Sequence, residues 1–274
     1  MFKQWLLVTF ILIAICVLVY PVQRYFIYFP SKEKPSRFQF NAKDMQDIDL
    51  RTPDGLDIYA WYKPAQAHQP VILYLHGNSG HIGHRMYLVR QFLAEGFGVM
   101  LLEYRGYGGN AGQPSELGLY IDGRTALRYL QAQHSNSIVI FGESLGTGVA
   151  TQLASEFSPC ALILQSPYTT LTAVARYLYP WIPIVLIDQF DSLARIKAIH
   201  APMLILHGKL DKIVPFEQGR MLYATANHPK QLQIFSDRGH NDLWDKEYVS
   251  IIEQFILTHC QLEKGVHRIN QTPH

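Results

Sequence analysis

The chain has 274 residues, 48% of them hydrophobic, so it can bury a core of its own, which argues against disorder over most of its length. Its 24 Lys and Arg nearly balance its 22 Asp and Glu without a long run of one sign, so nothing indicates nucleic acid as the main partner. The three cysteines show no CxxC spacing, so neither a zinc site nor a disulfide framework is indicated, while a single bridge between Cys160 and Cys260 stays open.

The first predicted element is a membrane anchor. Residues 5–20 are uncharged and almost wholly apolar, and with Pro21 and Val22 they reach the length of about 17 to 20 residues that a helix needs to cross a bilayer core. No small-x-small cleavage site follows, so we favour a retained anchor over a cleaved secretory signal. The aromatic residues that come next suit the headgroup layer of a membrane: Tyr25, Phe26, Tyr28 and Phe29.

The charges around the anchor leave its orientation open. Lys3 and the amino terminus precede it, and four basic residues follow it: Arg24, Lys32, Lys34 and Arg37. Taken literally, the positive-inside rule places the main domain in the cytoplasm, while a signal anchor that exports the domain remains the alternative.

After a polar linker around residues 31–41, apolar runs alternate with longer amphipathic segments. Residues 47–52 and 56–63 predict an antiparallel hairpin. Continuous apolar runs predict parallel strands covered on both faces, the last of them weakly: residues 71–75, 99–104, 138–141, 161–165, 203–206 and 231–235. Helical spacing appears in residues 85–95, 115–133, 145–157, 215–226 and 242–259. The repetition predicts an α/β fold, a doubly wound and mostly parallel sheet with helices on both faces.

The motif that carries chemistry is G-x-S-x-G at residues 142–146. It follows the apolar run 138–141 and leads into the helix at 145–157, which is the context of a nucleophile elbow. In such a turn Ser144 takes a strained backbone conformation, and the positions two before and two after it admit only very small side chains. A loop serine in a glycine-rich stretch is the alternative, and the strand-to-helix context favours a nucleophile.

His240 is the candidate base. A serine hydroxyl is a weak nucleophile at neutral pH and needs a base that is itself oriented by a carboxylate. His240 lies in a loop between the last candidate strand and the final helix, which brings it to the carboxyl edge of the sheet beside Ser144. A solvated surface histidine is the alternative, and the location favours the base.

Asp211, just past the strand at residues 203–206, is the leading candidate for the carboxylate. A helix cap or a pair with Lys209 or Lys212 is the alternative role for this side chain. Four other aspartates compete less well, because the first two belong to an intervening segment and the last two are too close in sequence to His240: Asp188, Asp191, Asp237 and Asp242.

The tetrahedral intermediate of acyl transfer needs hydrogen-bond donors for its oxyanion. The backbone N–H of Leu145, at the positive end of a helix, is one candidate, and the backbone N–H of Asn78, in the loop after residues 71–75, is the other. The histidines of this region are an alternative metal cluster, but no Cys or carboxylate joins them and their spacing fits no common zinc motif: His76, His81 and His84. We expect no metal and no cofactor.

Five motifs in this order together resemble the α/β-hydrolase superfamily: His76-Gly-Asn-Ser-Gly, Glu103-Tyr-Arg-Gly-Tyr-Gly, Gly142-Glu-Ser-Leu-Gly, His207-Gly-Lys-Leu-Asp211 and Gly239-His240. The chain looks most like the small membrane-anchored abhydrolase-domain branch, which includes bud-emergence-type proteins and related protein depalmitoylases, over residues 45–258. The resemblance implies a serine hydrolase of esters or thioesters. It carries five roles over: the triad of Ser144, Asp211 and His240, and the oxyanion donors Asn78 and Leu145. The oxyanion loop departs from the HGGG pattern of lipases.

We therefore expect four parts: an anchor at residues 1–24, a linker at 25–44, an α/β-hydrolase domain at 45–260 and a disordered tail at 261–274. Residues 166–200 are a candidate cap, because 168–190 are rich in aromatic and aliphatic side chains. That segment either roofs the site and accepts an acyl chain or packs on the sheet as a helix with a bent continuation.

The expected function is metal-independent hydrolysis of carboxylic esters or thioesters through an acyl-enzyme. The anchor favours apolar, membrane-derived acyl groups as substrates, small or attached to protein. A serine peptidase is the runner-up, although the short N-terminal region has no room for a propeller domain that gates the site. A catalytically silent membrane scaffold is the alternative from another class, since fold alone does not establish activity.

Overall fold

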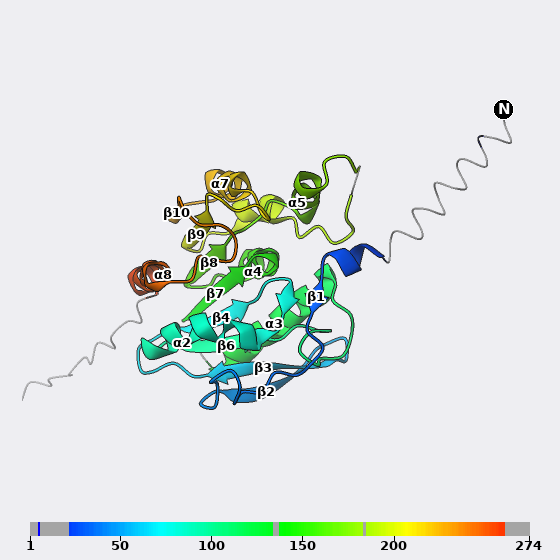
Figure 1. Cartoon of the computed structure of the whole chain (residues 1–274). Helices are drawn as coiled ribbons and strands as arrows, with labels where there is room; N and C mark the ends of the chain where they lie inside the picture. The colour runs from blue at the N-terminus through cyan, green and yellow to red at the C-terminus, as the bar shows by residue number, and fades with distance from the viewer. Residues whose placement is uncertain (1–4, 6–21, 134–136, 183–184, 261–274) are drawn as a thin grey trace, which may run out of the picture.

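A computed structural model describes residue 5 and residues 22–133, 137–182 and 185–260. The described chain forms one eight-stranded sheet with the strand order β10-β9-β8-β7-β4-β6-β3-β2, which runs from top to bottom in Figure 1. The strands are β2 (Gln46–Arg51), β3 (Asp57–Lys63), β4 (Val71–Leu75), β6 (Gly98–Leu102), β7 (Ile138–Glu143), β8 (Ala161–Gln165), β9 (Met203–Gly208) and β10 (Lys230–Phe235).

The sheet is mostly parallel, as the sequence predicts. Strand β2 pairs with β3 in an antiparallel hairpin, and β3 pairs antiparallel with β6. All neighbours from β6 through β4, β7, β8 and β9 to β10 are parallel. The carboxyl ends of these parallel strands therefore lie along one edge, where loops from several strands can meet.

Helices cover both faces of the sheet (Figure 1). On one face lie α2 (Met86–Ala94) and α8 (Lys246–His259), whose apolar residues share a core with Ile72 and Tyr74 of β4. On the other face lie α3 (Glu116–Gln133), α4 (Leu145–Glu156) and α7 (Phe216–Thr225), which pack with Leu73 and Leu75. Because successive side chains of β4 enter opposite cores, this strand is apolar at every position.

The remaining elements are short. They are β1 (Phe29–Pro30), β5 (Ser79–Gly80), α5 (Leu171–Leu178), α6 (Ser192–Arg195), and the 3-10 helices η1 (Gln23–Phe26), η2 (Ile82–Arg85) and η3 (Ile196–Ala198). Strands β1 and β5 form a separate two-stranded parallel sheet, with Phe29 opposite Ser79. Through this pairing, residues 29–30 contact the loop after β4.

The last helix begins later than the sequence predicts. The sequence predicts this helix over residues 242–259, and α8 begins at Lys246. The Asp245 carboxylate accepts a hydrogen bond from the Tyr248 N–H at 2.9 Å, so Asp245 is the N-cap. The Asp242 carboxylate instead accepts from the Gly239 N–H at 2.7 Å and shapes the loop that carries His240.

Of the predicted anchor, residues 1–24, only residue 5 and residues 22–24 are described, and the predicted tail at 261–274 lies outside the described residues. In the described part of the chain, we find no helix with the length and apolar character that a membrane crossing requires. The expected linker, residues 25–44, contacts the domain: Ile27 and Tyr28 are buried, and Ala42 is too.

Cys160 and Cys260 form a disulfide. Cys160 directly precedes β8 and Cys260 directly follows α8, so the bond ties the end of the last helix to the start of a central strand. The pairing that the sequence left open is thus present in the structure.

Candidate active site

Ser144 occupies the turn between β7 and α4. Its backbone has φ +50° and ψ −115°, a conformation that a residue with a side chain rarely adopts and that costs about 1–3 kcal/mol. Its own N–H donates to the Gln165 carbonyl of β8 at 2.9 Å, and its carbonyl accepts from the Thr147 hydroxyl at 2.6 Å. These bonds hold the turn at the carboxyl edge of the sheet.

The two glycines that bracket Ser144 are required by close packing. A Cβ atom on Gly142 would lie 2.7 Å from the Gly146 carbonyl oxygen, and one on Gly146 would lie 2.0 Å from the Leu75 carbonyl oxygen. Carbon and oxygen cannot approach so closely, so a larger residue at Gly142 would push α4 away from β7, and one at Gly146 would push α4 away from β4. The small residues predicted for these positions therefore allow the sharp turn.

His240 lies between Ser144 and Asp211. Its Nε2 is 3.0 Å from the Ser144 hydroxyl oxygen, and its Nδ1 is 2.6 Å from Oδ2 of Asp211. Both distances are those of hydrogen bonds. The structure thus brings together the three side chains that the sequence grouped, from the ends of β7 and β9 and from the loop after β10.

The environment of Asp211 keeps its carboxylate charged. Burial alone would raise its pKa, but hydrogen bonds from His207 and His240 hold the pKa well below its ordinary value. Its second oxygen accepts from the N–H groups of Ile213 and Val214 at 2.9 and 2.8 Å. A charged acceptor held this way can fix the tautomer of His240 with the proton on Nδ1.

Gly208, at the end of β9, lets the acid and histidine loops meet. A Cβ atom on this glycine would lie 2.3 Å from the Gly239 carbonyl oxygen and 2.4 Å from that of Arg238. The Leu210 N–H donates to the Arg238 carbonyl at 2.9 Å, which joins the two loops directly. Gly208 belongs to the motif His207-Gly-Lys-Leu-Asp211, but its role depends on the close approach of a loop that is distant in sequence.

The predicted oxyanion donors lie on two segments near the elbow. Leu145 is the first residue of α4, and the first N–H groups of a helix have no acceptor within the helix. Asn78 lies after β4, where its carbonyl accepts from the Phe29 N–H at 2.9 Å and its side-chain amide donates to the Ile27 carbonyl at 2.9 Å. Since its carbonyl and side chain are engaged, its backbone N–H is the group that could meet an oxyanion.

A buried ion pair that sequence analysis missed lies under the elbow. Glu143, next to Ser144, accepts from Arg85 Nε at 3.0 Å and Nη2 at 2.8 Å, and from the Tyr74 hydroxyl at 2.9 Å. Arg85 also donates to the Ser79 carbonyl at 2.9 Å. Burial opposes ionisation of Glu143, but Arg85 keeps its pKa below the ordinary value. The arginine therefore connects the elbow to the loop that holds Asn78.

The three histidines considered as metal ligands are divided between two settings. His76 Nε2 is 3.1 Å from Oε1 of Glu103, and both side chains are fully buried. The rings of His81 and His84 stack at 4.0 Å, and each packs edge-on against Phe40. Among the described residues, no group of three or more His, Cys, Asp or Glu is arranged to hold a metal ion.

The candidate cap contains α5 and α6. Helix α5 begins after Thr170, whose hydroxyl accepts from the Ala173 N–H at 3.0 Å. The Tyr168 hydroxyl donates to the Leu145 carbonyl at 3.1 Å. The start of this segment therefore contacts α4 at the residue that follows Ser144. Farther along, the end of α5 and the residues after it expose large apolar side chains.

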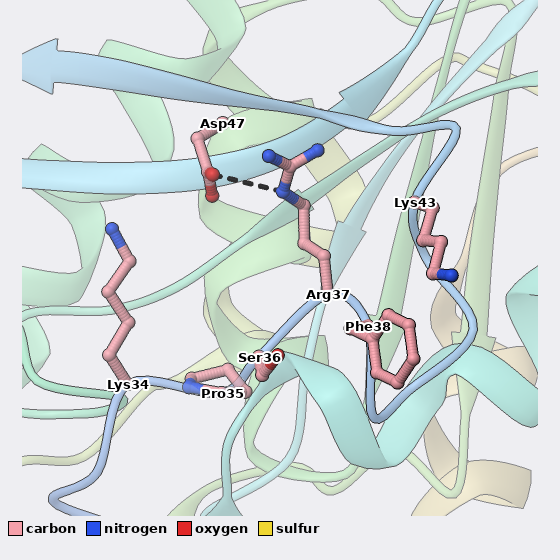
Figure 2. Close-up of a pocket in the computed structure, with 7 residues that line it drawn as sticks. All are labelled: Lys34, Pro35, Ser36, Arg37, Phe38, Lys43 and Asp47. Carbon is pink, nitrogen blue, oxygen red and sulfur yellow. Dashed lines mark ion pairs between the residues drawn. The ribbon is translucent and has the colours of Figure 1, made fainter.

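A cavity of about 470 Å³ lies away from Ser144, on the segment before β2. Figure 2 shows that Arg37 points toward Asp47, to which it is paired at 3.0 Å. The ammonium of Lys43 lies 3.8 Å from the centre of the Phe38 ring, and that of Lys34 lies over Tyr59. Each cation that lines the cavity thus already contacts a carboxylate or an aromatic ring. We therefore do not assign a binding site to this cavity.

Comparisons with known proteins show which proteins this chain is similar to. The family model described as serine aminopeptidase S33, Hydrolase_4, matches residues 66–187. The uncharacterized protein Rv2307c of Mycobacterium tuberculosis is 37% identical over 243 residues, which cover 86% of this chain and 86% of that protein. The lysophosphatidylserine lipase ABHD12 of Rattus norvegicus is 36% identical over 64% of this chain; the matched region spans only 50% of the lipase.

A solved structure shows the same fold. The esterase Pf2001 of Pyrococcus furiosus superposes with a TM-score of 0.71 and 18% identity, over 85% of this chain and 98% of the esterase. At this identity the likeness concerns the fold, an α/β architecture around a mostly parallel sheet.

Proposed function

The chain belongs to the α/β-hydrolase superfamily and is an ester-hydrolysing serine hydrolase, and from this premise we propose that Ser144, His240 and Asp211 form its catalytic triad. The observation that carries the proposal is the continuous hydrogen-bond chain from Asp211 through His240 to the Ser144 hydroxyl. A hydroxyl on a strained turn, next to a histidine that a buried carboxylate orients, is the arrangement that activates serine.

In the first half of the reaction, Ser144 Oγ attacks the substrate carbonyl carbon while its proton passes to Nε2 of His240. The carbonyl oxygen becomes an oxyanion, which accepts hydrogen bonds from the N–H groups of Asn78 and Leu145. The intermediate then collapses, and the bond to the leaving group breaks as His240 returns the proton to that group. An ester of Ser144 remains.

In the second half, water attacks the acyl-enzyme. His240 accepts the proton of the water, a second oxyanion forms and decays, and Ser144 recovers its proton as the carboxylic acid leaves. Asp211 stays ionised throughout and stabilises the positive charge that His240 acquires in each half.

We propose esters with apolar acyl groups as the substrates, on the support of one relative and of the predicted anchor. The chain resembles a lipase named for lysophosphatidylserine, a lipid ester, over about half of that lipase. The apolar residues 5–20 would hold the domain at a membrane as a retained anchor. The cap would lie between site and membrane. Thioesters react by the same steps and remain within the proposed substrate class.

A fluorophosphonate probe tests the role of Ser144, because such probes bind covalently only to an activated serine. We expect the full chain in detergent to be labelled, and Ser144→Ala to abolish both labelling and hydrolysis of p-nitrophenyl esters. Ser166→Ala is the matched control, since Ser166 is a buried serine of the neighbouring strand end. Undiminished labelling of Ser144→Ala would remove this residue from the role.

A serine peptidase is the second candidate, which the description of the matching family model favours. The same enzyme preparation, assayed with aminoacyl p-nitroanilides and with a chain-length series of acyl esters and thioesters, separates the two. Esterase activity that rises with acyl length supports the lipid-ester proposal, and cleavage of the anilides alone would replace it. If no substrate were turned over and no probe labelled the protein, the catalytically silent scaffold would be the remaining candidate.

A further inference from the structure

One end of the molecule exposes an unusual amount of aromatic and aliphatic surface. On η1, Tyr25 and Phe26 are 75% and 74% exposed, and on the segment after α5, Trp181 and Val185 are 76% and 65% exposed. We define the docking patch by six residues, all exposed: Tyr25, Phe26, Tyr177, Tyr179, Trp181 and Val185. Proteins that stay in water rarely leave so large a group of apolar side chains uncovered.

The two parts of the patch are held together by polar contacts. Arg24 pairs with Asp188 at 2.9 Å, and the Tyr28 hydroxyl donates to the same carboxylate at 2.9 Å. The Gln23 side chain accepts from the Ile187 N–H at 3.0 Å. Helix η1 and the segment after α5 therefore lie at the same end of the molecule, as Figure 1 shows.

The composition of the patch suits a lipid surface more than water or a charged partner. Between residues 167 and 187 the sequence contains a single charged residue, Arg176, which is exposed. Aromatic rings with polar tips prefer the headgroup layer of a bilayer, and Tyr and Trp supply four of the six patch residues. Residues 6–20, which precede η1 in the sequence, are apolar and uncharged.

The patch is also linked to the catalytic edge. The chain that carries Tyr25 and Phe26 continues to Ile27 and Phe29, which bind Asn78 through its side chain and its carbonyl. A surface bound at η1 would thus lie one short segment away from the oxyanion loop.

We propose that the docking patch binds the surface of a lipid bilayer, with its aromatic rings in the headgroup layer, so that the cap contacts the membrane in addition to the predicted anchor. Docking would bring the mouth of the site to the bilayer and let an acyl ester reach Ser144 without crossing water. Only this delivery step rests on the proposed function; the docking itself does not.

A fluorescent label tests the contact in the full chain, reconstituted in phosphatidylcholine vesicles. In a Cys16→Ser background, the NBD fluorophore is attached at Trp181→Cys, and in a matched variant at Leu257→Cys. Leu257 is an exposed apolar residue of α8, and this helix lies on the side of the molecule away from α5 (Figure 1). Doxyl-labelled phosphatidylcholine quenches only fluorophores that touch lipid.

We expect about a twofold loss of NBD emission at position 181, with a blue shift, because a ring in the headgroup layer meets the quencher. Position 257 should keep its emission. An equal loss of emission at both positions would overturn docking. A blue shift at position 181 without quenching would also overturn it, because it would mean that protein, such as a second copy of the chain, covers the patch.

Fluorophosphonate labelling of the same vesicles keeps the two proposals apart. Labelling without quenching at position 181 would sink the docking patch and leave the triad in place. Quenching without labelling would contradict the proposed triad and leave the docking patch in place.

Discussion

The catalytic edge and the docking patch are built in opposite ways. At the edge, the side chain of Asp211 is fully buried and that of His240 is 10% exposed, and each polar group meets a defined partner. At the patch, large apolar side chains face outward, and polar contacts such as Arg24 with Asp188 lie behind them. The edge buries its charges and the patch exposes its apolar groups.

This difference separates two tasks. Chemistry needs groups whose positions do not change during a reaction, and strands packed on both faces supply them. Contact with a fluid surface needs area and adaptable side chains, which an exposed segment supplies. Substitutions at the catalytic edge should therefore strongly change the rate of ester hydrolysis or the free energy of unfolding. A change of pH that affects the catalytic edge should not change the contact between the docking patch and lipid.

The largest expected effect is on the acid of the proposed triad. Asp211→Asn removes the charge and favours the wrong tautomer of His240, so kcat for ester hydrolysis should fall about 10³- to 10⁴-fold. Asp237→Asn is the matched control, because Asp237 is an exposed carboxylate in the histidine loop. A loss for Asp237→Asn that equals the loss for Asp211→Asn would contradict the assignment of Asp211.

A smaller effect, on stability, is expected beneath the elbow. Arg85→Met leaves the buried Glu143 without its charged partner, which should lower the free energy of unfolding by about 3–5 kcal/mol. Urea unfolding of the full chain in detergent, followed by tryptophan fluorescence, measures this loss. The exposed pair of Arg51 and Asp57 provides the comparison, and Arg51→Ala should cost about 0–1 kcal/mol.

Replacing both partners, Arg85→Met with Glu143→Gln, should recover part of the stability, because no unpaired charge remains. If Arg85→Met and Arg51→Ala cost the same, the pair under the elbow contributes no more than a surface pair, and the contrast between the two regions fails.

The smallest effect concerns pH. Ester hydrolysis should fall as the pH is lowered from 8 to 5, because a protonated histidine cannot act as a base. The lowered pKa of Asp211 keeps that carboxylate ionised as the pH falls from 8 to 5, so the loss belongs to the histidine and not to the acid. A rate that stays flat over this range would contradict the role of His240.

Quenching at position 181 should stay constant over the same range, because the six patch side chains include no carboxylate and no imidazole. The pH profile thus separates the two regions within one preparation.

Much of the fold follows from local patterns. The bounds of β4 and β8 agree with the apolar runs that the sequence predicts, since strands covered on both faces are apolar at most positions. The polar exception is Gln165 of β8, whose side-chain oxygen accepts hydrogen bonds from Trp244 and Tyr248. The elbow was also predictable, because the demands on Gly142 and Gly146 come from neighbours in the same turn and from the adjacent strand. The three triad side chains lie together, and their catalytic roles stay a prediction.

The features that sequence analysis missed depend on contacts between distant segments. Nothing near Arg85 indicates that its partner is Glu143, and nothing near Phe29 indicates that it pairs with Ser79. The start of α8 was misplaced because two aspartates, Asp242 and Asp245, could each cap a helix, and the first one is used by Gly239 instead.

The bond between Cys160 and Cys260 encloses Asp211, His240 and the whole cap in one covalent ring, while Ser144 lies outside it. A protease that cut the exposed chain near Trp181 would therefore release no fragment. The two pieces would migrate together on a gel until a reductant was added, and the acid and base would stay tethered to the part of the chain that holds the serine.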